Sequence, residues 1–183
     1  MKRIINSTYI SLDGVVELPH KWPTIERPTD ERADQIQEDL LMACDAVLMG
    51  RRTYEIFAPA WQARSGDPVS DRMNTMPKYL VSTTLQDPEW ANTTVISSDV
   101  AERIRELKEQ PGQDIVQYGF GAVSTLLMEH GLLDELRLWF HPLFVGKGST
   151  DDVLFPKGPP THFELTDATI LKNSMAILTY GLV

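Results

Sequence analysis

The alternation of short apolar segments with helix-patterned segments most constrains the fold of this chain. Apolar runs that end at glycine or at small polar residues predict strands at residues 4–12, 46–49, 79–82, 94–96 and 115–118. Helices are predicted between them, at residues 30–43, 51–57, 100–107 and 122–130. Two parallel strands need a crossover connection between them, which is usually a helix. The alternation therefore predicts an α/β sheet that is parallel in its middle.

The C-terminal part of the sequence is rich in strands. Strands are predicted at residues 136–145, 163–171 and 176–182, and the last two face each other across Lys172-Asn173-Ser174. They are expected to form an antiparallel hairpin. We expect Pro59 to end the helix at 51–57, and Asp99 with Glu102 resembles a capping box. A chain of 183 residues suffices for one domain. The expected architecture is a single domain over residues 1–183, with a mostly parallel sheet, flanking helices and an antiparallel C-terminal hairpin.

Charge and composition exclude several classes of function. The formal charge of −9 argues against a general nucleic-acid surface, because the phosphate backbone meets a repulsive field. No apolar run approaches the roughly 20 residues that span a bilayer, and the start, MKRIINSTYISLDG, lacks the apolar stretch of a signal peptide. The one cysteine, Cys44, suits a reducing compartment, and its apolar neighbours predict a buried thiol. We expect a cytoplasmic protein with neither nucleic-acid nor membrane partners.

Three predicted strand ends carry groups that suit phosphate. Ligands of an open α/β sheet gather at the carboxyl ends of its strands, where helix N-termini offer N–H groups. Gly50-Arg51-Arg52-Thr53 follows one strand, with a glycine for close backbone approach and two guanidinium groups. Ser82-Thr83-Thr84 follows the next, and Gly119-Phe120-Gly121-Ala122 opens a helix after a third. Each motif alone is weak, since no third glycine completes a dinucleotide fingerprint and there is no Walker loop. Their joint occurrence at strand ends favours a phosphate site.

Several segments resemble the dihydrofolate reductase-like fold and, within it, the reductase domain of the riboflavin biosynthesis protein RibD. The matching pieces follow the family's order and cover most of the chain: SLDG, LMGRRTYEIF, MPKYLVSTTL, IVQYGFGAVSTLL and LLDELRLWFHPLFVGKGSTDDVLF. The resemblance implies NADPH binding across the three strand ends. Gly50, Arg51, Arg52 and Thr53 would contact cofactor phosphates. Ser82, Thr83 and Thr84 would lie near the adenosine 2′-phosphate, and Gly119, Gly121, Ala122 and Val123 would line the pyrophosphate.

Hydride transfer usually also needs a proton source for the atom that gains electrons. Dihydrofolate reductases place a carboxylate of the first long helix at the substrate, and Asp34 lies at comparable spacing here, with Glu38 one turn later. Both can equally belong to the solvated side of an amphipathic helix. Asp13 of SLDG is another candidate or a simple turn residue, and Trp22 either covers the nicotinamide or caps the core. The four histidines show no metal-ligand spacing, so we predict no metal.

The resemblance implies an NADPH-dependent reductase like 5-amino-6-(5-phosphoribosylamino)uracil reductase, acting on a small heterocyclic or carbonyl/imine substrate. Two alternatives stay open: a pteridine reductase of the dihydrofolate type, and a non-catalytic nucleotide-binding sensor. A homodimer is expected as well. The resemblance suggests it, and the apolar run at residues 136–145 offers more hydrophobic surface than one edge strand should expose.

Overall fold

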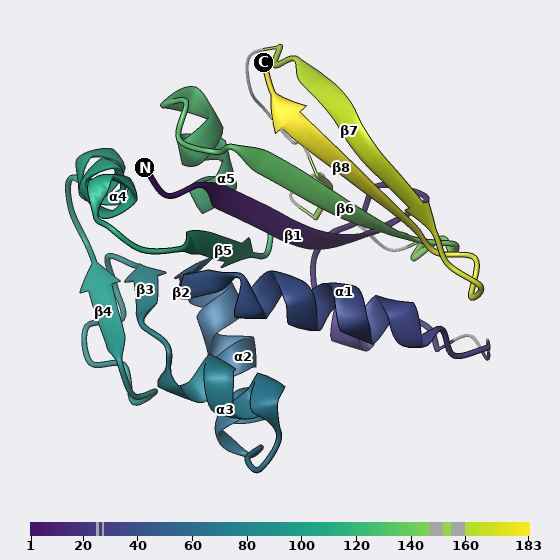
Figure 1. Cartoon of the computed structure of the whole chain (residues 1–183), viewed down its shortest axis with the longest axis horizontal. Coiled ribbons are helices and arrows are strands. Elements are labelled where there is room, and N and C mark those ends of the chain that lie inside the picture. Colours follow the sequence, from purple (N-terminus) through teal and green to yellow (C-terminus); the bar gives the residue numbers. More distant parts are fainter. Residues whose placement is uncertain (25, 27, 147–151, 155–159) are drawn as a thin grey trace.

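The computed structural model describes residues 1–24, 26, 28–146, 152–154 and 160–183. Its strands form one eight-stranded sheet with the order β4-β3-β2-β5-β1-β6-β8-β7 (Figure 1). The strands are β1 (Ile4–Ser11), β2 (Cys44–Gly50), β3 (Lys78–Val81), β4 (Thr93–Ile96), β5 (Asp114–Tyr118), β6 (Glu135–His141), β7 (Phe163–Ile170) and β8 (Ala176–Leu182). The strands from β4 to β6 in this order pair in parallel, whereas β8 is antiparallel to both β6 and β7. The predicted α/β class and C-terminal hairpin are confirmed.

Helices cover both faces of the sheet. They are α1 (Glu31–Met42), α2 (Arg51–Gln62), α3 (Pro68–Thr75), α4 (Val100–Glu109) and α5 (Ala122–Glu129), and a 3₁₀ turn spans Pro19–Lys21. Side chains of α1, α2 and α3 join a buried cluster with Ile5 and Val47 of the sheet. Those of α4 and α5 join another cluster with the adjacent Ile4 and Leu48. Successive residues of a strand thus serve opposite cores, as the two-residue period of a strand requires.

The argument for a homodimer from the hydrophobic surface of residues 136–145 is wrong, because it treats this run as an exposed edge strand. β6 lies between β1 and β8, and its side chains Leu136, Leu138 and Trp139 are buried. The edge strands of the sheet are β4 and β7, and on β7 Leu165 and Ile170 are exposed. The hydrophobic character of β6 is therefore explained by its central position.

One expected helix end and one expected helix cap are also wrong. α2 continues through Pro59 to Gln62, and Phe57 and Trp61 pack against the core cluster on either side of the proline. Burial of these two rings stabilises the last turn, although proline removes one helical hydrogen bond. Asp99 makes no side-chain cap, because its backbone is left-handed with φ of 49°, and Glu102 instead contacts Arg105.

α3 was not predicted, although its start has a clear signal. Asp67 precedes Pro68, and its carboxylate accepts hydrogen bonds from the backbone N–H groups of Val69 (3.1 Å) and Ser70 (3.0 Å). Aspartate at the N-cap followed by proline at the first helical position is a favoured helix start. The helix has only eight residues, so its apolar periodicity is too short to stand out.

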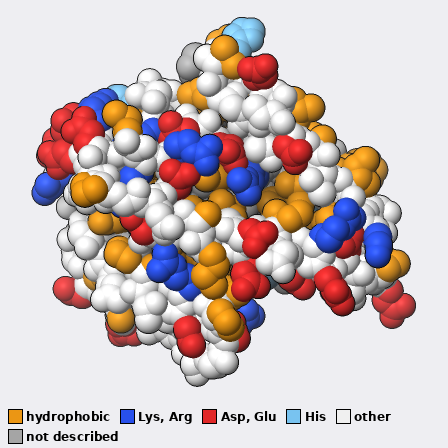
Figure 2. Space-filling model, viewed as in Figure 1, with side chains coloured by type: hydrophobic (Ala, Val, Ile, Leu, Met, Phe, Trp, Pro, Cys, Tyr) orange, Lys and Arg blue, Asp and Glu red, His pale blue; other side chains and the backbone are white. Residues whose placement is uncertain are grey.

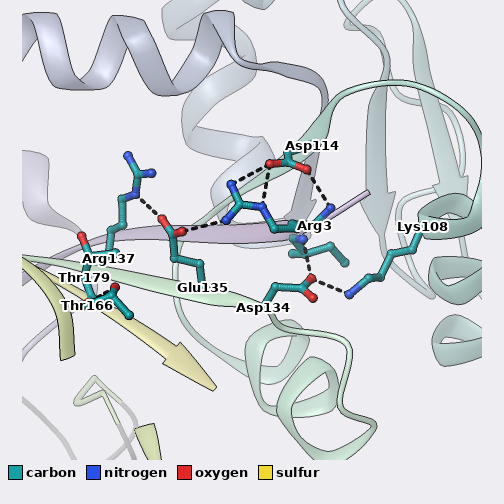
Figure 3. A network of polar contacts seen from close by, with 9 residues as sticks. Arg3, Lys108, Asp114, Asp134, Glu135, Arg137, Thr166 and Thr179 are labelled. Atoms are coloured by element: carbon teal, nitrogen blue, oxygen red, sulfur yellow. Dashed lines mark hydrogen bonds and ion pairs between the residues drawn. The ribbon is translucent and has the colours of Figure 1, made fainter. Parts of the chain in front are cut away.

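A network of charged groups fixes the amino ends of the strands (Figure 3). The buried Lys108 of α4 contacts Asp134, whose carboxylate accepts a hydrogen bond from the N–H of Ile4 (2.7 Å). Arg3 pairs with Asp114 (2.9 Å) and Glu135 (3.3 Å), the first residues of β5 and β6. The network holds the amino ends of β1, β5 and β6 together, and their carboxyl ends lie on the opposite side of the sheet.

Candidate functional site: three neighbouring strand ends

The strand-end site comprises the segments that follow β2, β3 and β5. These strands are neighbours in the order β3-β2-β5, and all pair in parallel. Gly50 lies opposite Val81 of β3, and Met49 lies opposite Tyr118 of β5. The sheet therefore brings the three sequence motifs side by side at the carboxyl ends of these strands.

Two helices begin at this site without a side-chain cap. Gly50 precedes α2 and Gly121 precedes α5, whereas α1 and α3 are capped by aspartate carboxylates. The first N–H groups of a helix lack partners inside it, and their partial positive charge favours an anion. A Cβ at Gly121 would meet nothing within 4 Å, so the approach to α5 is open. A Cβ at Gly50 would lie 3.3 Å from the side chain of Val123, so the starts of α2 and α5 lie close together.

The two adjacent arginines point to different partners. Arg51 donates from Nη1 to Thr84 Oγ1 (2.6 Å), and its Nε pairs with Glu55 (2.6 Å). Arg52 Nη1 lies 3.6 Å from a carboxylate oxygen of Glu17, in the loop after β1. Arg51 thus contacts the hydroxyl-rich segment after β3, and Arg52 approaches the loop on the other side. On the face seen in Figure 2, basic and acidic side chains intermingle, so positive charge is available only locally.

The hydroxyl segment after β3 contains one buried and two exposed residues. Ser82 is buried, and its Oγ accepts hydrogen bonds from the backbone N–H groups of Thr84 (3.3 Å) and Leu85 (3.0 Å). Thr83 and Thr84 are exposed. Ser82 therefore shapes the turn, and the two threonines present hydroxyl groups at its surface.

The turn after β5 requires glycine. Gly119 has φ of +78°, and a Cβ there would lie 2.4 Å from Thr53 Oγ1. Thr53, in the first turn of α2, donates to the carbonyl oxygen of Tyr118 at 3.5 Å. Phe120 is buried in the core cluster beneath α4 and α5. The phenyl ring thus points inward, and the exposed Gly121 leads into α5.

Asp13 is held in a structural arrangement. Its carboxylate accepts hydrogen bonds from Ser11 Oγ (2.5 Å) and from the N–H groups of Val145 (3.1 Å) and Gly146 (2.9 Å). These bonds, that of Ser11 first, lower the pKa of Asp13 from 3.8 to about 2. Asp13 is therefore ionised near neutral pH and ties the segment after β6 to the turn after β1. It is the weakest of the three candidates for a proton donor.

Asp34 and Glu38 both lie on α1, and Asp34 is close to Tyr9 of β1. Asp34 is exposed and Glu38 half-buried. Burial raises the pKa of Tyr9, and the nearby charge of Asp34 raises it further, whereas a hydrogen bond with Gln37 opposes the shift. Gln37 Nε2 lies 3.4 Å from the Tyr9 hydroxyl, and Gln37 Oε1 is buried without a hydrogen-bond partner among the described residues. Asp34 and Gln37 thus lie near the Tyr9 hydroxyl, between α1 and β1.

Aromatic contacts connect this region to the strand-end site. The Tyr9 ring lies 4.7 Å from that of His141, and the Trp22 ring lies 5.5 Å from His141. Trp22 Nε1 donates to the carbonyl oxygen of Glu17 (2.9 Å), whose carboxylate approaches Arg52. Contacts therefore run without a gap from α1 to α2. Sequence reasoning missed Tyr9 and Glu17, and a tyrosine amid smaller polar residues of β1 was the available signal.

Other titratable groups give little reason for a second site. Cys44 is buried, as predicted, and burial raises its pKa to about 12. Within the described ranges, no group of three or more histidine, cysteine or acidic side chains could hold a metal ion. A cavity of about 590 Å³ at the start of α1 is lined by Arg32 and Lys172, but Arg32 pairs with Asp30 at 2.8 Å.

No helix in the described part of the chain is long and apolar enough to cross a membrane.

Comparisons with known proteins agree with this architecture. Residues 2–177 match the family model of the RibD C-terminal domain. YyaP of Bacillus subtilis (strain 168), an uncharacterized protein, is 27% identical over 155 aligned residues, and the match covers 80% of this chain and 78% of that protein.

Two solved structures share the fold. A putative riboflavin biosynthesis protein from Shewanella sp. PV-4 matches with a TM-score of 0.71 and 18% identity, over 100% of this chain and 99% of that chain. The diaminohydroxyphosphoribosylaminopyrimidine deaminase/5-amino-6-(5-phosphoribosylamino)uracil reductase of Thermotoga maritima matches with a TM-score of 0.66 and 17% identity, over 100% of this chain and 57% of that chain. The family match over nearly the whole sequence and the shared sheet architecture show that this chain belongs to the RibD C-terminal domain family and has the dihydrofolate reductase-like fold.

Proposed function

We propose that the protein is an NADPH-dependent reductase that transfers hydride to a small heterocyclic or carbonyl/imine substrate, of the kind reduced in riboflavin biosynthesis. One observation carries the proposal. A cation paired with a threonine hydroxyl, two helix starts without side-chain caps and a glycine turn meet at neighbouring strand ends. These groups match the phosphates of a dinucleotide. Membership of a reductase family supports the same class of reaction.

The contacts divide the cofactor's phosphates between two parts of the site. Arg51 and Thr84, which contact each other, are assigned to the adenosine 2′-phosphate, with the exposed Thr83 beside them and Ser82 shaping the turn. The pyrophosphate is assigned to the starts of α2 and α5, where the positive charge of Arg52 and the backbone N–H groups favour an anion. That set comprises Gly50, Arg52, Thr53, Gly119, Gly121, Ala122 and Val123.

Bound NADPH supplies a hydride to the substrate. The chain's own residues must hold the substrate beside it and provide a proton. We assign the proton to Asp34 on α1, with Glu38 one turn further along the same helix as the alternative. Tyr9, Trp22 and His141 form the adjoining aromatic surface, which suits a planar ring.

The test is a nucleotide titration followed by a substrate panel. Purified protein is titrated with NADPH and then assayed for NADPH oxidation with pyrimidine, pterin and carbonyl substrates. We expect the protein to bind NADPH and to oxidise it in the presence of a pyrimidine or carbonyl substrate. Turnover with pterins alone identifies a dihydrofolate-type reductase, and binding without turnover on the whole panel identifies a sensor. Absence of NADPH binding refutes the proposal.

A further inference from the structure

The carbonyl oxygen of Gly119 receives hydrogen bonds from several buried side chains. Gln117 Nε2 donates at 2.7 Å, Asn6 Nδ2 at 2.9 Å and Ser124 Oγ at 3.3 Å. These donors come from β5, β1 and the first turn of α5. A carbonyl oxygen has two lone pairs, so the two shorter bonds saturate it and the serine adds a weaker contact. The glycine turn is thus anchored from inside the protein.

The donors are buried and are themselves held in place. Asn6, Gln117 and Ser124 are each exposed by 1% or less. Asn6 and Gln117 are register partners on neighbouring strands and contact each other through their amide groups. Ser124 Oγ also lies within hydrogen-bond distance of Gln117 Oε1 (3.1 Å), and Thr8 Oγ1 donates to Asn6 Oδ1 (2.8 Å). Each amide is therefore fixed in orientation by a neighbour.

A buried network of polar side chains contributes little to the stability of the fold, so its presence indicates another role. Burying an amide stabilises a protein little even when it is hydrogen-bonded, and an apolar residue fills the same space more favourably. The same face of β1 carries Ile4 and Ile10 in the apolar core, and β5 contributes Ile115. Polar side chains replace apolar ones directly below the glycine turn. The network therefore serves the turn rather than the core.

Anchoring this carbonyl fixes how the chain enters α5. A trans peptide is planar, so the position of the Gly119 oxygen sets the orientation of the peptide that follows. Gly119 has positive φ and Gly121 is extended, with no side-chain cap at the helix start. Without the anchor, glycine-rich backbone has many alternative conformations. Ser124 holds the first turn of α5 to the same oxygen.

We propose that Asn6, Gln117 and Ser124 are positioning residues for the diphosphate group of the nucleotide, which they orient by anchoring the Gly119 carbonyl beneath the start of α5. The inference rests on the proposed function and deepens it. Because NADPH and NADH share the diphosphate, loosening the anchor weakens both alike. A nucleotide with a 2′-phosphate and no diphosphate, such as 2′-AMP, does not depend on it.

The experiment compares three nucleotides in matched variants. Gln117→Leu and Ser124→Ala are titrated by calorimetry with NADPH, NADH and 2′-AMP. The control is Ser70→Ala, because Ser70 is also a buried serine in the first turn of a helix, α3. Thermal unfolding and circular dichroism verify the fold of each variant. If Gln117→Leu does not fold, Ser124→Ala removes only one hydroxyl group and carries the test.

We expect the dissociation constants of NADPH and NADH to rise together by about tenfold in Gln117→Leu, with a smaller rise in Ser124→Ala, while 2′-AMP binding changes less than about twofold. Ser70→Ala should lose stability and keep all three affinities. Folded variants with unchanged NADPH and NADH binding overturn the inference, as does an equal loss of 2′-AMP binding. Wild-type protein that binds none of the nucleotides refutes the proposed function itself, and the inference with it.

Discussion

Replacing Arg51 by alanine tests which phosphate this arginine binds. The guanidinium group lies 2.6 Å from Thr84 Oγ1, on the side of β2 that faces the hydroxyl segment. A charge-assisted hydrogen bond contributes roughly 1.5–3 kcal/mol, and about 1.4 kcal/mol is a tenfold change in affinity. The Arg51 side chain is 49% exposed and also pairs with Glu55, so water and that carboxylate both weaken its contribution. We therefore take the lower limit and expect NADPH binding to weaken about tenfold.

The affinity for NADH, which lacks the 2′-phosphate, should fall less than about twofold in the same variant. Arg52→Ala is the matched control, since Arg52 approaches Glu17 instead of Thr84. It should weaken both cofactors alike. Calorimetric titration of wild type and both variants with NADPH and NADH measures these ratios. Equal losses for the two cofactors in Arg51→Ala would refute the 2′-phosphate assignment, and no loss in either variant would refute the phosphate site altogether.

Three further outcomes follow from the same structure, and a fourth follows from the family resemblance. Asp34→Asn should lower turnover about 10²–10⁴-fold, the usual contribution of general acid–base catalysis, while NADPH affinity stays within about twofold; steady-state kinetics and titration measure both. Gly119→Ala should destabilise the protein by about 2–4 kcal/mol in urea unfolding, from the contact with Thr53 and the positive φ, whereas Gly121→Ala should cost far less. Because the folded-state pKa of Asp13 is lowered to about 2, its contribution to stability is present above the unfolded value of 3.8 and lost as pH falls through 2. The stability difference between wild type and Asp13→Asn should vanish over that interval in unfolding measurements. A homodimer is still expected from the family resemblance, although the interior position of β6 removes the argument from an exposed edge strand. Light scattering at micromolar concentration should give the mass of a homodimer, and a monomer would contradict it.

Much of the fold could be predicted from the sequence because its strands are short, apolar and separated by clear turns. The positions of β1 to β5 and of the terminal hairpin follow from local periodicity alone. The central position of β6 does not, because the order of strands in a sheet depends on contacts between distant segments. Pro59 does not end α2, because burial of the rings around it outweighs its local preference, and Asp99 forms no cap, because its backbone is left-handed.

The candidate site divides in the same way. Its glycines, arginines and hydroxyl groups form contiguous motifs, so they could be found from sequence. The different directions of Arg51 and Arg52 could not, since successive residues of a helix point about 100° apart and their partners lie on other segments. Asn6 and Gln117 are 111 residues apart and meet only through the register of β1 and β5. Polar residues within apolar strands were the sole local sign of this network.

A structure from crystals of the protein soaked with NADPH would show where each phosphate of the cofactor binds. We expect the adenosine 2′-phosphate beside Arg51 and Thr84, and the diphosphate over the start of α5 at Gly121. A cofactor bound elsewhere, for example in the cavity lined by Arg32 and Lys172, would contradict this expectation.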